Sequence, residues 1–312
     1  MSQSTNTILM IRPHGFRANE QTATSNYFQK IGENRNSSEL TLAAQEEFDS
    51  FVELLKEHGV NVIVHQDSGD HDTPDSVFPN NWLSFHEDGT VALYPMMAEN
   101  RRSERQEVVI ETIEKAGFCI SNFIDYTGAE TEGIFLEGTG SIVLDRENRK
   151  AYCALSPRAD EDLFVEFCED FEYTPVVFEA FQTVGGSRKP IYHTNVVMCI
   201  ADRYAVVCLD AIDDKKERRF LEKSLKFDGK KIIAISEEQM HSFAGNMLQV
   251  QSQTGKTHLV MSQQAYDAFS PEELNSLKAL DTLITVSIPT IEYCGGGSAR
   301  CMMAEVFLPK SK

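Results

Sequence analysis

The sequence of 312 residues is 41% hydrophobic, which is enough for a large buried core in one or two domains. Its formal net charge is −19, with 48 acidic residues against 29 Lys and Arg, so its field repels nucleic acid and anionic membranes. The polar segment 1–7 lacks the apolar core of a secretory signal, and no apolar run approaches the roughly 18 residues that span a bilayer. We therefore expect a cytoplasmic protein that binds neither nucleic acid nor membranes.

The predicted elements repeat a pattern in which a β-hairpin is followed by a helix and another strand. The hairpin strands are β-branched or aromatic runs separated by polar turns. In chain order we predict a strand at 8–11, a helix at 40–58 and a strand at 60–64; a hairpin of 82–86 and 90–94 and a helix at 101–116; a hairpin of 142–144 and 151–153 and a helix at 159–169; a hairpin of 196–200 and 204–208, a helix at 213–226 and a strand at 231–235; and a hairpin of 247–250 and 258–261, a helix at 262–280 and a strand at 302–307.

The two ends of the chain each carry half of a fifth unit. Pairing the strand at 302–307 with the strand at 8–11 would complete that unit and close a ring, as circular repeat folds do. Each unit begins just after a polar residue, and successive polar residues are 56, 56, 53 and 55 positions apart. These residues are Asn81, Glu137, His193, Asn246 and Cys301. Equivalent positions in a ring lie at one end near the axis, so these side chains are expected to converge; an open α/β sheet is the alternative architecture.

Seven cysteines occur, without a C-x-x-C motif and mostly within apolar strands. This pattern indicates reduced thiols rather than disulfides or zinc ligands. Cys199 and Cys208 are expected to fill the core. The other cysteines are Cys119, Cys153, Cys168, Cys294 and Cys301.

Cys301 stands apart because it follows Gly295-Gly296-Gly297 and Arg300. A glycine run lets backbone N–H groups approach a ligand, and a neighbouring arginine favours the thiolate, which is the form that attacks carbon. A cysteine with a distant histidine is a nucleophile candidate, and His193 precedes the apolar run 196–200.

Motifs for cofactors and metals are weak. No glycine pattern of the dinucleotide or P-loop type follows a strand. The histidines and aspartates between 65 and 72 lie in a polar loop, where a solvated surface is expected rather than a metal site. The sequence therefore predicts neither a metal nor a cofactor.

Taken together, these residues resemble the guanidino-group-modifying (amidinotransferase, or pentein) superfamily. The resemblance covers nearly the whole chain and is closest to bacterial citrulline-utilisation (CtlX-like) hydrolases, through residues 79–82 and 94–102. It implies an α/β fold, a five-bladed pseudo-symmetric ββαβ propeller closed by its N- and C-terminal strands, in a single domain spanning 1–312. The other matching segments are 74–82, 136–141, 192–195 and 296–301.

The resemblance also implies roles for the converging side chains. Cys301 would attack the central carbon of a guanidino or ureido group and split the displacement into two steps. His193 would protonate the leaving nitrogen and then activate water. Glu137 would accept hydrogen bonds from the substrate. Arg101 and Arg158 match the arginines that bind the carboxylate of an amino-acid substrate, since a guanidinium binds carboxylates bidentately.

Asn81 departs from the family pattern, in which many members carry a second aspartate six residues after the one at Asp75. An amide can accept an N–H and also donate to a urea oxygen, so Asn81 favours a neutral ureido group over a guanidinium. Asp75 is a candidate for orienting the substrate amine or a neighbouring backbone, and the segment 12–17 is a candidate lid.

The leading hypothesis is a cofactor-free cysteine hydrolase of citrulline-like amino acids. A deiminase or hydrolase of arginine or methylarginine and an amidinotransferase are the alternatives within the family, and a non-catalytic ring-fold scaffold is the alternative outside it. A small-molecule amino acid is thus the expected partner. The sequence allows a homodimer without deciding the oligomeric state.

Overall fold

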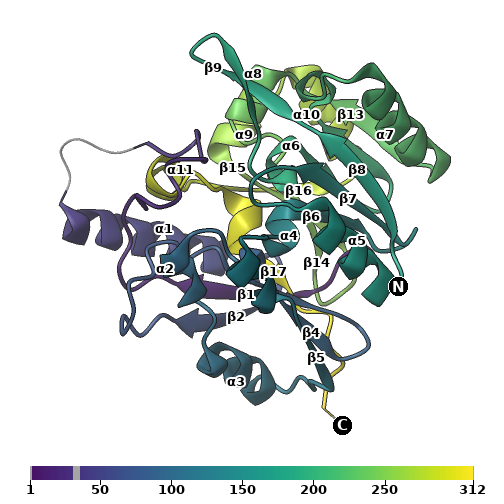
Figure 1. The fold of residues 1–312 in the computed structure, drawn as a ribbon. Helices are drawn as coiled ribbons and strands as arrows, with labels where there is room; N and C mark the ends of the chain where they lie inside the picture. The colour runs from purple at the N-terminus through teal and green to yellow at the C-terminus, as the bar shows by residue number, and fades with distance from the viewer. Residues whose placement is uncertain (1, 31–35, 312) are drawn as a thin grey trace.

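The computed structural model of the chain describes residues 2–30 and 36–311. Five three-stranded sheets share one topology, in which the middle strand is antiparallel to one neighbour and parallel to the other (Figure 1). The sheets are β17 (Ala304–Glu305), β1 (Thr7–Arg12) and β2 (Asn61–Gln66); β3 (Leu83–Phe85), β4 (Thr90–Leu93) and β5 (Asn122–Asp125); β6 (Ile142–Asp145), β7 (Lys150–Leu155) and β8 (Thr174–Glu179); β11 (Met198–Ile200), β12 (Tyr204–Val207) and β13 (Lys231–Ala234); and β14 (Leu248–Gln251), β15 (Thr257–Ser262) and β16 (Thr282–Val286).

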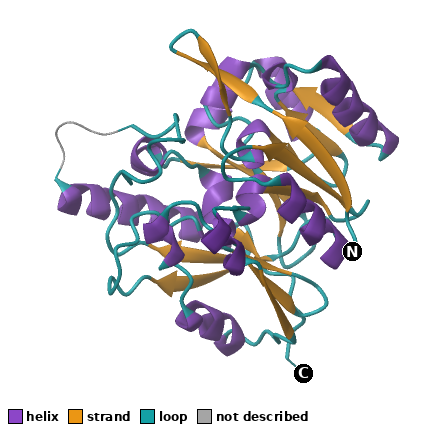
Figure 2. Cartoon of the chain, viewed as in Figure 1, coloured by secondary structure: helices purple, strands orange, loops and turns teal. Residues whose placement is uncertain are grey.

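Helices connect the parallel strands of each sheet and lie mostly at the periphery (Figure 2). These connections are α1 (Ser37–Glu57); α2 (Glu99–Arg102) and α3 (Glu107–Lys115); α5 (Glu161–Asp170); α7 (Lys215–Phe227); and α9 (Gln263–Ala268) and α10 (Pro271–Lys278). In α7, the Asp214 side chain accepts hydrogen bonds from the N–H groups of Lys216 and Glu217, while Leu221 and Leu225, one turn apart, are buried. Local capping and an apolar stripe thus account for this helix.

Short helical segments precede the first strand of several sheets and contact one another. They are η1 (Pro79–Asn81), α4 (Gly138–Ser141), α6 (Thr194–Val197) and η4 (Ala299–Met302). Contacts join η1 to α4, α4 to α6 and η1 to η4. Four of the positions expected to converge, Asn81, Glu137, His193 and Cys301, lie in or beside these segments, and Asn246 lies just before β14. The fold therefore brings these positions together.

The predicted pairing of the two chain ends is present. β1 pairs with β17 through Ile8 and Glu305 and through Leu9 and Ala304 (Figure 1). β17 is shorter than the predicted strand 302–307, because Cys301 and Met302 lie in η4 and regular pairing is confined to two residues.

Several predicted boundaries were wrong for local reasons. The helix at 262–280 divides before Pro271, where Ser270 and Glu273 form a capping box that starts a new helix. The helix at 101–116 divides between α2 and α3. The strand at 196–200 begins late, because Val196 and Val197 belong to α6.

Further elements were not predicted. β9 (Phe181–Val184) and β10 (Ser187–Pro190) form a hairpin around Gly185 and Gly186, whose φ angles of 56° and 79° suit a tight two-residue turn. The remaining helical segments are η2 (Thr127–Glu132), η3 (Leu209–Ala211), α8 (Glu237–His241) and α11 (Pro289–Gly295).

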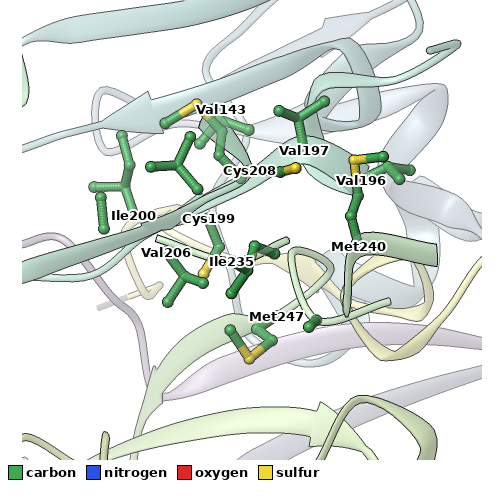
Figure 3. Packing of buried hydrophobic residues seen from close by; sticks show 14 of the residues in the cluster. Val143, Val196, Val197, Cys199, Ile200, Val206, Cys208, Ile235, Met240 and Met247 are labelled. Carbon is green, nitrogen blue, oxygen red and sulfur yellow. The ribbon is translucent and has the colours of Figure 1, made fainter. Parts of the chain in front are cut away.

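The apolar faces of the sheets and helices form the core. Figure 3 shows Cys199 and Cys208 among valine, isoleucine and methionine side chains of the largest cluster, as their sequence context predicts. None of the seven cysteines, all in the described residues, forms a disulfide. Across residues 2–30 and 36–311, no helix combines the length and apolar character needed to cross a bilayer.

Candidate active site

A small cavity of about 20 Å³ lies where the short helical segments meet. Six of the seven predicted site residues line it: Asp75, Asn81, Arg101, Arg158, His193 and Cys301. The seventh, Glu137, is fully buried behind His193. Residues up to 226 positions apart in sequence therefore share one pocket.

Cys301 enters the cavity from η4, after a glycine run that ends α11. Gly296 has a φ of 63°, a left-handed conformation typical of glycine at a helix C-terminus. A Cβ at Gly295 or Gly297 would lie 2.8 or 2.9 Å from the Phe78 ring. The glycines therefore permit the close packing that places Cys301, and they follow a helix as well as preceding β17.

The expected support of the thiol by Arg300 is absent. The Arg300 guanidinium donates to the Met303 carbonyl at 2.8 Å and to Glu305 at 2.9 Å. The side chains that reach the Cys301 sulfur are two buried amides: Asn246 donates at 3.3 Å and Asn195 at 3.5 Å. In the sequence, the regular spacing of polar residues indicated Asn246. The only available signal for Asn195 was its position two residues after His193.

His193 and Glu137 form a buried pair. The His193 Nε2 atom lies 2.7 Å from Glu137 Oε2, and Glu137 Oε1 accepts the Met97 N–H at 3.1 Å. Burial would raise the pKa of Glu137, but Arg158 at 3.4 Å and His193 outweigh it and lower that pKa well below its usual value. Burial lowers the pKa of His193 to about 4, and Glu137 offsets only part of this effect. The arrangement at neutral pH is therefore a carboxylate that holds a neutral imidazole.

The Asn81 amide lies next to that imidazole. A Cβ at Gly140 would be 2.5 Å from Asn81 Nδ2 and 2.8 Å from His193 Nδ1. Any larger residue at Gly140 would push into both side chains. Position 140 thus has to be glycine for the two groups to sit together.

Arg101 is held by a second acidic residue that the sequence analysis did not single out. Its guanidinium makes two parallel bonds to buried Glu104, both 2.9 Å, and donates to Asn81 Oδ1 at 2.8 Å. Burial raises the pKa of Glu104 to about 7, whereas the paired bonds from Arg101 favour its ionised form. Most of the Arg101 fork is therefore occupied within the protein. In the sequence, the only signal for this pair was that Glu104 follows Arg101 by three positions, a spacing at which helical side chains meet.

Asp75 has one unsatisfied oxygen. Its Oδ2 accepts from Asn19 at 2.8 Å, while among the described residues no hydrogen-bond partner exists for Oδ1. Burial raises the pKa of Asp75, and Arg101 nearby opposes the rise. A buried acceptor that lines a cavity without a partner is ready for a donor from a bound molecule.

The cover of the cavity comes from residues 19–26 rather than from 12–17. Arg158 donates to the Thr22 carbonyl at 3.0 Å and to Ser25 Oγ at 2.6 Å, and Asn26 donates to the Gly296 carbonyl at 3.2 Å. In the segment predicted as a lid, Arg17 instead pairs with Asp72 on the surface. No motif in the sequence marked residues 19–26.

No group of three or more His, Cys, Asp or Glu side chains in the described ranges is arranged to hold a metal ion. The sequence analysis placed His65 in a polar loop, but it lies in β2, and its Nδ1 atom is 2.9 Å from Thr112 Oγ1.

Glu292 in α11 gives a test of the electrostatics beside the glycine run. It accepts from Ser298 Oγ at 2.5 Å, and burial raises its pKa from 4.5 to about 7. The folded chain then binds more protons than the unfolded chain between these values, so this group lowers the free energy of unfolding as pH rises through that window. When the pH rises from 4.5 to 8, the free energy of unfolding of the Glu292→Gln variant should increase by about 3 kcal/mol relative to that of the parent. This figure takes about 1.4 kcal/mol for each pKa unit of the shift.

Urea unfolding at both pH values measures this difference. Glu114→Gln, at an exposed glutamate in α3, is the control and should track the parent. Parallel pH profiles for the parent and the Glu292 variant would contradict the assignment.

Comparison with known proteins shows which family the chain resembles and which solved structures share its fold. A sequence model of the family described as N,N dimethylarginine dimethylhydrolase, eukaryotic, matches residues 12–308. No match is found among curated protein sequences.

Three solved structures show a similar fold. The apo structure of ArgZ, an arginine dihydrolase from the ornithine-ammonia cycle in cyanobacteria, has a TM-score of 0.73 and 19% identity, with 97% of this chain and 41% of that chain covered. The N-terminal domain of ArgZ bound to substrate has a TM-score of 0.72 and 19% identity, covering 97% and 99%. A dimethylarginine dimethylaminohydrolase variant in an adduct with S-methyl-L-thiocitrulline has a TM-score of 0.62 and 15% identity, covering 96% and 98%. The chain thus spans less than half of full-length ArgZ but nearly all of its N-terminal domain.

Proposed function

We propose that this chain, which belongs to the N,N dimethylarginine dimethylhydrolase family and is therefore a hydrolase of C–N bonds other than peptide bonds, cleaves the ureido group of citrulline or a close relative. The observation that carries the proposal is the shared cavity of Cys301 and His193, with Glu137 bonded to the imidazole. A thiol, a base and an orienting carboxylate are the parts that covalent cysteine catalysis requires.

In the first step, the Cys301 thiolate attacks the ureido carbon and forms an S–C bond. The bond from this carbon to the side-chain nitrogen breaks, and ornithine leaves after that nitrogen receives a proton from His193. In the second step, water attacks the S-carbamoyl group as His193 takes its proton. The products are the free thiolate and carbamate, which decomposes to ammonia and carbon dioxide.

The His193–Glu137 pair supports these proton transfers. Because the ionised Glu137 accepts from Nε2–H, Nδ1 is the nitrogen that exchanges protons. The lowered pKa of His193 keeps the imidazole neutral at physiological pH, so it can take the thiol proton and pass it to the leaving nitrogen. The ureido carbon is a poor electrophile, and the covalent intermediate divides its displacement reaction into two easier steps.

The cavity lining supports a neutral ureido substrate through Asn81. This amide lies beside His193 where many members of the family carry a carboxylate, and its Oδ1 already accepts from Arg101, so it adds no negative charge for a guanidinium. Asp75 Oδ1 would accept a substrate N–H. Arg158, whose bonds to residues 22 and 25 a substrate carboxylate would replace, is the better placed of the two predicted carboxylate ligands.

A second candidate is hydrolysis of the guanidino group of arginine or a methylarginine. The unpartnered carboxylate oxygen of Asp75 favours it, because a carboxylate binds a cationic guanidinium strongly. ArgZ, named as an arginine dihydrolase, has the same fold.

The architecture completes the proposal. We infer that the five sheets are blades of one pseudo-symmetric propeller in a single domain, since they share one topology and the helical segments that open four of them contact one another. Residues at the start of different blades then form one axial site.

Product analysis tests the function. The protein is incubated separately with citrulline, arginine and methylarginines, and ornithine, citrulline, amines and ammonia are quantified. Ornithine formed from citrulline supports the ureido reading; citrulline or ornithine formed only from guanidino substrates supports the second candidate. Transfer to an added amine with no hydrolysis would identify an amidinotransferase, and inertness toward all of them would contradict both.

Substitution of Asn81 tests substrate choice. Asn81→Asp adds a charge beside His193 and is expected to raise the ratio of kcat/KM for arginine over citrulline by roughly 10- to 100-fold, the range of a charge-assisted hydrogen bond. Asn122→Asp makes the same chemical change at an exposed asparagine in β5 and should leave the ratio near that of the parent. An unchanged ratio in Asn81→Asp would refute the role of the amide.

A further inference from the structure

Two asparagines from different sheets converge on the nucleophile sulfur. Asn195 lies in α6, before β11, and Asn246 lies just before β14. Both side chains are buried, at 1% and 0% exposure, and their Nδ2 atoms lie 3.5 and 3.3 Å from Cys301 Sγ. The His193 imidazole makes its hydrogen bond to Glu137, through Nε2 at 2.7 Å, rather than to the sulfur.

Backbone partners define which end of the Asn246 amide faces the sulfur. Its Oδ1 accepts the Arg300 N–H at 3.1 Å, and its Nδ2 donates to the Asn195 carbonyl at 3.1 Å. Rotating the amide by half a turn would place oxygen against carbonyl and NH₂ against N–H. The Asn246 Nδ2 atom is therefore the amide atom nearer to Cys301 Sγ, at 3.3 Å against 3.6 Å for Oδ1.

Asn195 is oriented in the same sense. Its Nδ2 lies 3.4 Å from the Thr139 carbonyl, so the amide nitrogen sits between that oxygen and the sulfur. Two N–H donors thus lie within reach of one buried sulfur. The contacts in which the sulfur would donate to the two amide oxygens are longer, 3.6 Å to Asn246 and 3.9 Å to Asn195. A neutral thiol offers a proton as well as a weak acceptor, whereas a thiolate is an acceptor alone, so two donors favour the anion.

We propose that Asn195 and Asn246 are catalytic residues that stabilise the Cys301 thiolate, in the place that the sequence suggested for Arg300. The proposal deepens the proposed function and rests on Cys301 being the nucleophile. Hydrogen bonds to the anionic form favour it by the same physics that lowers the pKa of capped carboxylates. The amide donors hold the anion without adding a charge that would repel a cationic leaving group.

Other ionisable groups face the same space. Asp75, Arg101, Arg158, Tyr192 and His193 line the cavity with Cys301, and Arg300 adjoins it in sequence. A test therefore has to change the amides and leave these charges in place.

The experiment is a thiolate titration by absorbance near 240 nm. Each protein is compared with the same protein carrying Cys301→Ser, so that the difference spectrum reports this sulfur alone. The proteins are the parent, Asn195→Ala, Asn195→Asp and Asn246→Asp. Gln249→Ala is the control, because it removes a buried carboxamide that contacts Asp202 and Asp281 rather than the sulfur.

The expected result is a rise in the titration midpoint by about one pH unit in Asn195→Ala, with roughly tenfold slower alkylation by iodoacetamide at neutral pH. The Asp variants should shift further, because a carboxylate repels the thiolate, and Gln249→Ala should match the parent. Should Asn246→Asp fail to fold, the two Asn195 variants decide.

An unchanged midpoint in both Asn195 variants would overturn the proposal, even if turnover persists. A shifted midpoint in a protein that turns over none of the amino acids above would uphold the amide pair and count against the proposed function. The titration needs no substrate, so the two failures are distinguishable.

Discussion

Cys301→Ala is expected to lower kcat/KM by a factor on the order of 10⁴ or more, because loss of a nucleophile removes the covalent route altogether. The remaining cavity would still bind the substrate, since Asp75, Asn81 and Arg158 are untouched. Substrate affinity, measured by calorimetry, should therefore change little while turnover disappears.

The control is Cys119→Ala, at an exposed cysteine whose sulfur contacts the Ser311 hydroxyl at 3.3 Å. This variant should retain full turnover. Intact mass spectrometry of the parent during turnover should also reveal a carbamoyl- or amidino-sized adduct that the Cys301 variant lacks. Turnover by Cys301→Ala at more than a small percentage of the parent rate would refute the mechanism.

Glu137→Gln is expected to have the second largest effect, on both activity and stability. The variant loses the charge that fixes the His193 tautomer and leaves the buried Arg158 without its carboxylate. Breaking one side of a buried ion pair costs about 3–5 kcal/mol of unfolding free energy. Loss of the orienting carboxylate should lower kcat by roughly 10²- to 10⁴-fold.

The pH dependence of that stability difference has a definite sign. The pKa of Glu137 is lowered in the folded chain, so its ionised form contributes stability above the usual value of 4.5, and this contribution disappears as pH falls. The parent should therefore exceed the variant most at neutral pH and converge with it in acid.

Urea unfolding at pH 7 and pH 3 measures both points, with Glu132→Gln, at an exposed glutamate in η2, as the matched control. Equal unfolding free energies for the parent and Glu137→Gln at pH 7 would show that the buried pair contributes nothing.

Local patterns were enough to predict much of the fold. Alternating apolar runs located hairpin strands such as β4 and β12, because strand periodicity is encoded within a few residues. Regular spacing placed Asn81, Glu137, His193 and Cys301 at equivalent points of a repeat, and in the structure three of them line one cavity while Glu137 bonds to His193. The convergence of these side chains was thus present in the sequence as a period.

Tertiary structure alone decided which groups contact the reacting atoms. Arg300 neighbours Cys301 in sequence but turns to Glu305, whereas Asn195, 106 positions away, reaches the sulfur. Likewise the cover over the cavity falls on residues 19–26, and Arg101 is bound by Glu104. A short side chain has only a few rotamers, so its partner depends on where packing places the backbone of distant segments. Period and propensity are properties of the chain, but the pairing of buried polar groups is a property of the folded core.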